Sequence, residues 1–200
     1  NEHYTSYGIE KLEKAISDVT GIMPDKYLVI DMQTFSKAID TIGGINITVE
    51  KDLSDMAYPG PNGTYTTFSI AKGTYTFDGE TALKYARSRH STSDFDRAIR
   101  QQKIAQAVVE KLKEKDFLSQ IKSSANIFLD ILEGVKTDTS AMEFLAYFKK
   151  YQKYELETGN VLTTANYLSS TTNQRGQYIL LPKTENDNEI QKYLAELILQ

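Results

Sequence analysis

The stretch YARSRHSTSDFDRAIRQQ, from Tyr85 to Gln102, contains four of the five arginines in the chain. A guanidinium group is flat and always charged, and it can hold a phosphate or carboxylate through two parallel hydrogen bonds. Only two carboxylates lie in the same stretch, so the arginines outnumber the nearby acids. This surplus of positive charge favours a bound anion such as phosphate or pyrophosphate. The polar residues concerned are Arg87, Arg89, Arg97, Arg100, Asp94, Asp96 and Gln101.

The spacing within this stretch predicts a helix that begins near Asp94. Such a helix places Arg97, Arg100 and Gln101 on one face, because residues three and four apart are neighbours on a helix. The same face continues with two apolar residues, Ile104 and Val108. The arginine face therefore leads into hydrophobic surface. Polar groups at the end of a buried face are either paired internally or line a pocket.

A second interpretation of the same residues is purely structural. An arginine–aspartate network could brace the start of the helix, with Asp94 or Asp96 as its cap. The two aspartates could also bind Mg²⁺ or act as a base. The simplest role for them is to orient the arginines, and the residues alone leave these alternatives open.

Length and composition limit the classes of protein to be considered. The 200 residues can bury one good-sized core, so a single domain is expected. The net charge of −4 argues against a general nucleic-acid binder. Cysteine is absent, which excludes disulfides and thiolate metal sites and is compatible with export. No apolar run is long enough to span a membrane, and because the chain opens on Asn1, we expect a fragment of a longer protein.

Upstream of the arginines, helical and strand patterns alternate, which predicts an α/β protein. We expect a helix over 8–20, a strand buried on both faces over 27–30, a helix capped by Thr34 and closed by Gly43-Gly44, and a half-buried strand over 45–49. Residues 52–67 are rich in Pro, Gly and Asn and predict a loop, followed by a hairpin around Gly73. A short helix over 80–85 then leads to the first two arginines.

Downstream of the arginines, the sequence predicts a helix over 118–132, a helix capped by Thr139 or Ser140, a strand over 178–181 and a final helix over 190–198. The second of these helices should turn Met142, Leu145 and Phe148 inward. Residues 149–154, KKYQKY, mix lysine with tyrosine and are interpreted as a solvated helix end. The chain contains no G-x-S-x-G elbow, P-loop, G-x-G-x-x-G or histidine metal motif.

Two long segments resemble the LytR-CpsA-Psr (LCP) family of cell-envelope proteins. They are DMQTFSKAIDTIGGINITVEKDL, residues 31–53, and FSIAKGTYTFDGETALKYARSRHSTSDFDRAIRQQ, residues 68–102. The shared features are a helix that ends in Gly-Gly before a strand, two glycines six positions apart ahead of ALxYxRxR, and DxxRxxRQQ. The resemblance extends over nearly the whole chain, from residue 7 to the strand near residue 180.

The resemblance implies a membrane-anchored phosphotransferase on the extracytoplasmic side of the plasma membrane. Such an enzyme moves an anionic glycopolymer, teichoic acid or capsular polysaccharide, from an undecaprenyl-pyrophosphate carrier to peptidoglycan. The implied fold is a three-layer α/β/α sandwich with a central mixed sheet and a hydrophobic lipid pocket. By matching motifs, the pyrophosphate is held by Arg87, Arg89, Arg97, Arg100 and Gln101, catalysis involves Arg97, Arg100 and Asp94, and the lipid pocket includes Ile104 and Val108.

The resemblance also implies Mg²⁺ as the cofactor, held mainly by an aspartate-rich segment that precedes the matched region in the family. We therefore expect residues 1–200 to form a single LCP-type domain, incomplete at its N-terminus and weakly active or inactive alone. An alternative is a non-catalytic module of the envelope that binds polyprenyl phosphate or a polyanion. The family's historical name, transcriptional attenuator, suggests a regulator, but the acidic charge and the lack of a helix-turn-helix signature argue against binding to nucleic acid.

Overall fold

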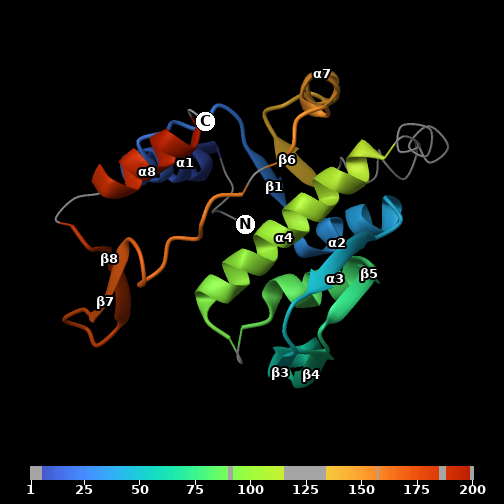
Figure 1. The fold of residues 1–200 in the computed structure, drawn as a ribbon, viewed down its shortest axis with the longest axis horizontal. Coiled ribbons are helices and arrows are strands. Elements are labelled where there is room, and N and C mark those ends of the chain that lie inside the picture. The colour runs from blue at the N-terminus through green and yellow to red at the C-terminus, as the bar shows by residue number, and fades with distance from the viewer. Residues whose placement is uncertain (1–5, 90–91, 115–133, 157, 185–187, 199–200) are drawn as a thin grey trace. The chain divides into compact units, whose positions relative to one another are not determined.

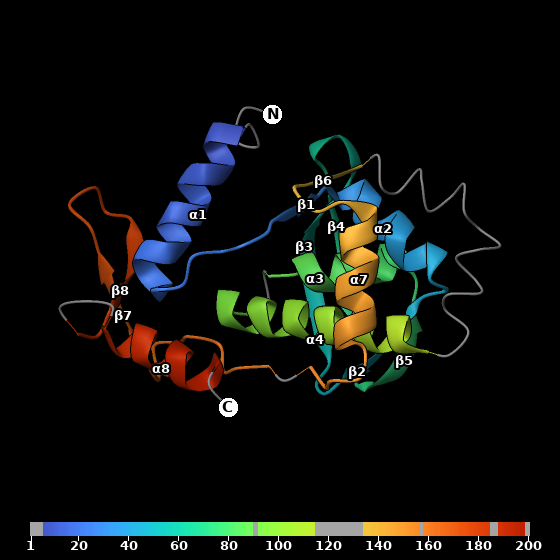
Figure 2. The same ribbon diagram turned by 90° about the horizontal axis from the view of Figure 1, so that it is seen from above.

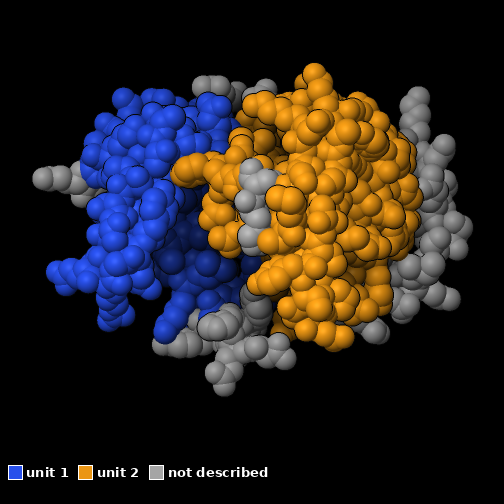
Figure 3. Space-filling view, turned by 90° about the horizontal axis from the view of Figure 1, so that it is seen from below, with its two compact units in different colours: residues 1–27, 159–200 blue, residues 28–158 orange. Residues whose placement is uncertain are grey.

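The computed structural model describes residues 6–89, 92–114, 134–156, 158–184 and 188–198, and the chain divides into two compact units. Unit 1 contains residues 1–27 and 159–200, and unit 2 contains residues 28–158 (Figures 1 and 3). Helices in the described ranges are all too short or too polar to cross a membrane. The helix expected over 118–132 lies outside the described residues. That the whole chain forms one domain stays a prediction.

Unit 1 consists of two helices and a hairpin. The helices α1 (Ser6–Thr20) and α8 (Asn188–Ile198) contact each other, and the Gln191 amide donates a hydrogen bond of 3.3 Å to the Asp18 carbonyl. The strands β7 (Leu168–Thr172) and β8 (Tyr178–Pro182) pair in antiparallel fashion. Both helices and β8 confirm the elements predicted from the sequence.

The strands of unit 2 form antiparallel pairs, seen beside helices α2, α3 and α4 in Figure 2. The pairs are β1 (Leu28–Ile30) with β6 (Val135–Thr137), β2 (Ile45–Val49) with β5 (Gly73–Phe77), and β3 (Leu53–Pro59) with β4 (Tyr65–Ile70). The predicted α/β class is confirmed, while the described strands pair in twos rather than in one mixed sheet. Buried and exposed residues alternate along β2, as in a strand covered on one face only.

Three local predictions in this unit are wrong. The strand over 27–30 is not buried on both faces, because Leu28 is 57% exposed; among the described residues, β1 pairs with β6 alone. Residues 52–67 are not a loop, since the turn-forming residues occupy only the tip between β3 and β4. The expected hairpin around Gly73 does not form either. Gly73 pairs with Val49 and Ile70 pairs with Leu53, so β5 pairs with β2 and β4 pairs with β3 instead of with each other.

The helix α2 (Met32–Thr41) begins at a different cap from the one predicted. The Asp31 carboxylate accepts a 2.7 Å hydrogen bond from the backbone N–H of Thr34, so Asp31 is the cap and Thr34 lies inside the helix. Hydrogen bonds from the backbone and the side chain of Thr34 lower the pKa of Asp31. At the other end, Gly43 and Gly44 adopt φ values of 78° and 83°, and both terminate the helix as predicted.

Replacement of the two glycines should separate backbone strain from steric overlap. Both occupy the left-handed region, which costs an L-residue about 1–2 kcal/mol. A Cβ at Gly44 would also lie 2.8 Å from the Phe77 carbonyl oxygen, whereas a Cβ at Gly43 meets nothing within 4 Å. We expect Gly44→Ala to lower the free energy of unfolding by about 2 kcal/mol and Gly43→Ala by about 1 kcal/mol. Urea unfolding of both variants tests this, and equal losses would contradict the overlap.

The main core of unit 2 fixes the ends of the two helices that carry the arginines. Helix α3 (Gly79–Arg87) packs closely on α2, where the Gly79 N–H donates to the Asp40 carboxylate at 2.7 Å. A Cβ at Gly79 would overlap the backbone of Ser36, so this approach requires glycine. The rings of Phe77 and Tyr85 meet edge to face with centroids 5.3 Å apart. The buried cluster consists of Ile39, Ile45, Ile47, Val49, Leu53, Phe77, Ala82, Tyr85, Ile104 and Ala107.

Candidate functional site

The arginine helix α4 (Asp94–Lys113) begins where the sequence predicts, but its cap is Ser93. The Ser93 hydroxyl accepts a hydrogen bond from the Asp96 N–H at 3.1 Å, and the Asp96 carboxylate accepts one from the Ser93 N–H at 2.9 Å. The prediction of Asp94 or Asp96 as the cap is therefore wrong. Hydrogen bonds from the Ser93 side chain and backbone lower the pKa of Asp96. The Asp96 carboxylate is thus part of the helix cap, and Asp94 is the acid of this stretch that pairs with the arginines.

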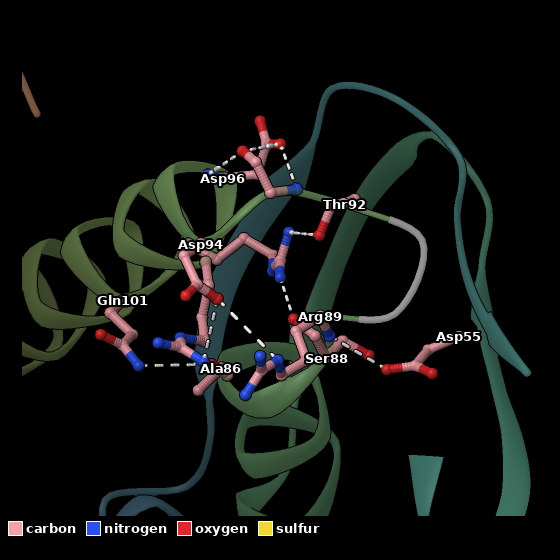
Figure 4. A network of polar contacts seen from close by, with 11 residues as sticks. Asp55, Ala86, Ser88, Arg89, Thr92, Asp94, Asp96 and Gln101 are labelled. Carbon is pink, nitrogen blue, oxygen red and sulfur yellow. Dashed lines mark hydrogen bonds and ion pairs between the residues drawn. The ribbon is translucent and has the colours of Figure 1, made fainter. Parts of the chain in front are cut away.

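Arg100 is buried, with 6% of its surface exposed. Its Nε donates to the Tyr85 carbonyl at 2.9 Å, one terminal nitrogen donates to the Thr92 hydroxyl at 3.2 Å, and the other donates to the Ser88 carbonyl (Figure 4). Its guanidinium carbon also lies 5.7 Å from the centre of the Tyr85 ring. Burial lowers the pKa of Arg100. Arg100 therefore connects the start of α4 to the end of α3, and its predicted contact with pyrophosphate stays a prediction.

Arg89 and Arg97 share one carboxylate. The Asp94 Oδ1 lies 3.3 Å from a terminal nitrogen of Arg97 and 3.9 Å from Nε of Arg89 (Figure 4). The side chains of Asp94 and Arg89 are more than half exposed, and exposed pairs of this kind contribute only about 0–1 kcal/mol. Two guanidinium groups thus remain weakly neutralised by one acid, and a doubly charged anion could compete with Asp94 for them.

The other two predicted ligands lie beside this pair of arginines. A terminal nitrogen of Arg87 lies 3.4 Å from the Tyr58 hydroxyl, and its guanidinium lies 5.6 Å from the centre of that ring. Gln101 is exposed and donates to the Ala86 carbonyl at 3.4 Å. Within the described residues, the structure therefore joins Arg89, Arg97 and Asp94, while Arg87 contacts an aromatic ring instead of a carboxylate.

Asp55 is a residue that the sequence reasoning missed. It is completely buried, and its carboxylate accepts hydrogen bonds from the backbone N–H groups of Arg89 at 3.0 Å and Ala57 at 3.1 Å. It therefore holds the backbone that carries Arg89. The available signal was the alternation at the start of β3, where Leu53 and Asp55 are buried on either side of the exposed Ser54. Residues 52–67 were predicted to be a loop, so this inward-facing acid was not recognised.

A cavity of about 560 Å³ lies beside the arginine helix within unit 2. It is lined almost entirely by apolar side chains of α2, α4, β1 and helix α7 (Ala141–Tyr151). Ile104 and Val108 line it, as the sequence predicts for a pocket, although a lipid in it stays a prediction. Gln101 and Ala86 are its lining residues closest in sequence to the arginines, and Gln101 stands one helical turn beyond Arg97. The arginine at the start of α4 and the apolar cavity thus lie next to each other along this helix.

The described residues do not fit a complete magnesium site. No group of three or more carboxylates or histidines that could hold a metal ion occurs among them. Asp94 is held by two arginines, Asp96 by the helix cap and Asp55 by backbone N–H groups. Hard cations such as Mg²⁺ prefer oxygen ligands that are open to coordination. We therefore derive no step through a metal at this site.

Comparison with curated proteins identifies two informative relatives. The regulatory protein MsrR of Staphylococcus aureus is 27% identical over 199 residues, which cover 98% of this chain and 58% of MsrR. The polyisoprenyl-teichoic acid–peptidoglycan teichoic acid transferase TagV of Bacillus subtilis is 25% identical over 201 residues, which cover 98% of this chain and 49% of TagV. The chain thus spans about half the length of these relatives.

Solved structures and a family model also match this chain. The crystal structure of B. subtilis TagV matches with a TM-score of 0.71 and 25% identity, covering 98% of this chain and 72% of that one. The structure of gbs0355 from Streptococcus agalactiae, at 24% identity and a TM-score of 0.68, has the same fold. The model of the LytR_cpsA_psr family matches residues 1–196. The chain therefore belongs to the LytR_cpsA_psr family.

Proposed function

We propose that the protein is a phosphotransferase that attaches an anionic glycopolymer, teichoic acid or capsular polysaccharide, to peptidoglycan from a polyprenyl-pyrophosphate carrier. The observation that carries the proposal is the position of Arg89 and Arg97, weakly neutralised by Asp94, next to an apolar cavity on the same helix. A lipid diphosphate has these two parts in the same order. The relative TagV, a polyisoprenyl-teichoic acid–peptidoglycan teichoic acid transferase, supports this substrate class.

In the proposed complex, the prenyl tail occupies the cavity along α4. Its lining is apolar, and each buried CH₂ group contributes about 0.8 kcal/mol. A few isoprene units are therefore enough to hold the carrier. The diphosphate then extends from the Gln101 end of the cavity towards Arg97 and Arg89. Such an arrangement places the charged group in the more exposed part of the site and keeps the tail out of water.

The reaction breaks the phosphoanhydride bond of the carrier and forms a phosphodiester between the glycopolymer and peptidoglycan. A sugar hydroxyl of peptidoglycan attacks the phosphorus that carries the glycopolymer, the bond from that phosphorus to the bridging oxygen breaks, and polyprenyl phosphate leaves. The arginines stabilise the negative charge that develops on the phosphate oxygens. Asp94 forms ion pairs with the two guanidinium groups, and its proposed role is to orient them and to act as the base that accepts the proton of the hydroxyl. Mg²⁺ is proposed as the cofactor on the grounds of family membership alone.

The partners in this proposal are the lipid-linked glycopolymer and peptidoglycan, and the location is the extracytoplasmic side of the plasma membrane. A direct test follows transfer of a radiolabelled glycopolymer from its polyprenyl diphosphate to peptidoglycan, with and without Mg²⁺. The proposal expects label in the peptidoglycan and release of polyprenyl phosphate. Saturable binding of the carrier with no release in the longest natural form of the protein would instead indicate a binding module.

The cavity can be tested separately from the chemistry. Val108 is partly buried and lines the cavity, so Val108→Phe should fill part of it. We expect the Kd for a long-chain polyprenyl phosphate to rise about tenfold, equivalent to about two buried CH₂ groups, with no change for a short-chain analogue. Ile99→Phe is the matched control, because Ile99 is an exposed residue of α4 outside the cavity. Equal effects on both chain lengths would exclude the tail from this cavity.

A further inference from the structure

The end of α7 carries a surface band of tyrosine and lysine residues. Three rings follow one another, with centroids 6.5 Å apart from Tyr147 to Tyr151 and 6.1 Å apart from Tyr151 to Tyr154. All three rings are exposed, Tyr154 by 58%. Lys150 and Lys153 lie among them. We call these five residues the Tyr–Lys band.

Helix α7, which carries Tyr147, Lys150 and Tyr151 of this band, has no buried residue. Met142 is 76% exposed, so its predicted inward orientation is wrong, whereas Leu145 and Phe148 line the cavity as an inward orientation requires. An amphipathic helix of a globular protein normally buries its apolar stripe. Phe144 borders the tyrosines of the Tyr–Lys band in a shared groove, and exposed apolar surface of this kind marks an interaction site.

The charge of the band favours an anionic partner. Residues 149–154 contain three lysines and no acid, although the whole chain has a net charge of −4. The ammonium groups lie over the rings, with Lys150 Nζ 4.9 Å from the centre of Tyr151 and Lys153 Nζ 5.2 Å from the centre of Tyr154. A sugar that stacked on the covered faces of Tyr151 and Tyr154 would have to displace Lys150 and Lys153. A lipid headgroup region requires no displacement, because it accepts tyrosine rings together with lysine stems and ammonium groups.

The band also adjoins the cavity of the candidate site. A groove of about 440 Å³ is lined by the three tyrosines of the band and by Val109, Leu112, Phe144 and Phe148. Those last four residues also line the cavity of about 560 Å³. Apolar surface is therefore continuous from the Tyr–Lys band to the cavity, and a hydrocarbon chain could follow it without crossing a polar barrier.

We propose that the Tyr–Lys band is a contact surface for an anionic lipid bilayer. The tyrosine rings lie at headgroup level, the lysines bind headgroup phosphates, and the groove receives an acyl or prenyl chain from the bilayer. The inference rests on the proposed function for the identity of that chain, and it explains how the tail reaches the cavity. The surface binding itself depends only on the band and can be measured without any transfer reaction.

The test is sedimentation of the chain with vesicles of phosphatidylglycerol and phosphatidylcholine, compared with vesicles of phosphatidylcholine alone. We expect binding to the anionic vesicles that weakens as salt rises. The double variant Lys150→Gln/Lys153→Gln should weaken it roughly 30-fold, since each lysine near an anionic surface contributes about 1 kcal/mol, which is about fivefold in affinity. Lys14→Gln/Lys72→Gln is the matched control, because it removes the same charge from two exposed lysines outside the band.

Three outcomes would overturn the proposal: no binding of the wild-type chain, equal weakening in both double variants, or binding of a peptidoglycan oligosaccharide instead of the vesicles. A transfer assay with a short-chain diphosphate substrate separates this inference from the proposed function. The Lys150→Gln/Lys153→Gln variant should keep its turnover in that assay while losing vesicle binding. Loss of the transfer activity in an arginine variant that still binds vesicles would leave the bilayer contact intact.

Discussion

Arg97→Ala is expected to lower glycopolymer transfer about 10²–10³-fold while it leaves the free energy of unfolding within about 0.5 kcal/mol of the wild-type value. The loss of rate is that of a missing donor to the charge of the transition state. The small effect on stability follows from the structure, because Arg97 forms an ion pair with the exposed Asp94 at 3.3 Å. Transfer from the lipid diphosphate and urea unfolding are the two measurements.

The chain offers a matched control for this variant. Arg175 is the arginine outside the cluster, exposed in the turn between β7 and β8, and Arg175→Ala should change neither quantity. Arg97→Lys keeps the charge but lacks the two-pronged geometry, so its rate should fall between the wild type and Arg97→Ala. Wild-type turnover in Arg97→Ala would remove this helix from the reaction.

Arg100→Ala is expected to behave in the opposite way and to lower the free energy of unfolding by about 3–4 kcal/mol. The buried guanidinium donates to the oxygens of Tyr85, Ser88 and Thr92, and alanine would leave the buried acceptors without partners. Each such loss costs about 1–3 kcal/mol, partly relieved where water enters. Arg100 also covers one face of the Tyr85 ring in the core, so packing is lost as well.

Urea unfolding at constant pH measures this loss, with Gln101→Ala as the neighbouring control. Gln101 makes one exposed hydrogen bond of 3.4 Å, so its removal should cost less than about 1 kcal/mol. If Arg100→Ala were as stable as the wild type, the buried network would not hold the two helices together. The comparison of Arg97 with Arg100 then separates an arginine that faces a ligand from one that supports the fold.

Long regular patterns explain what the sequence could predict. The 20-residue helix α4 and the Gly43-Gly44 stop follow from periodicity and backbone conformation, which are local properties. Strand partners are not local, and the sequence offers no signal that Gly73 pairs with Val49 across more than twenty residues. The prediction of a loop over 52–67 failed because turn-forming residues at one tip outweighed the alternation in the flanking strands.

The contacts between side chains of the candidate site are also non-local, so the sequence alone does not predict them. The spacing of Arg97 and Arg100 predicts that they share a helix face, but it cannot show which one is buried against α3. That difference depends on carbonyl groups contributed by another helix. Asp55 lies more than thirty residues from Arg89 in the sequence, so its hydrogen bond to the Arg89 backbone is visible only in three dimensions.

The hydrogen bonds that α4 donates to α3 have an electrostatic consequence for any anion near Arg89. The carboxyl end of a helix carries a partial negative charge on its last carbonyl oxygens, and such an end repels phosphate. At the end of α3, Arg100 covers the oxygens of Tyr85 and Ser88, and Gln101 covers that of Ala86. Hydrogen-bond donors therefore offset the partial negative charge at this end of α3. The neighbouring guanidinium groups can then attract a phosphate over a short distance without repulsion from these carbonyl oxygens.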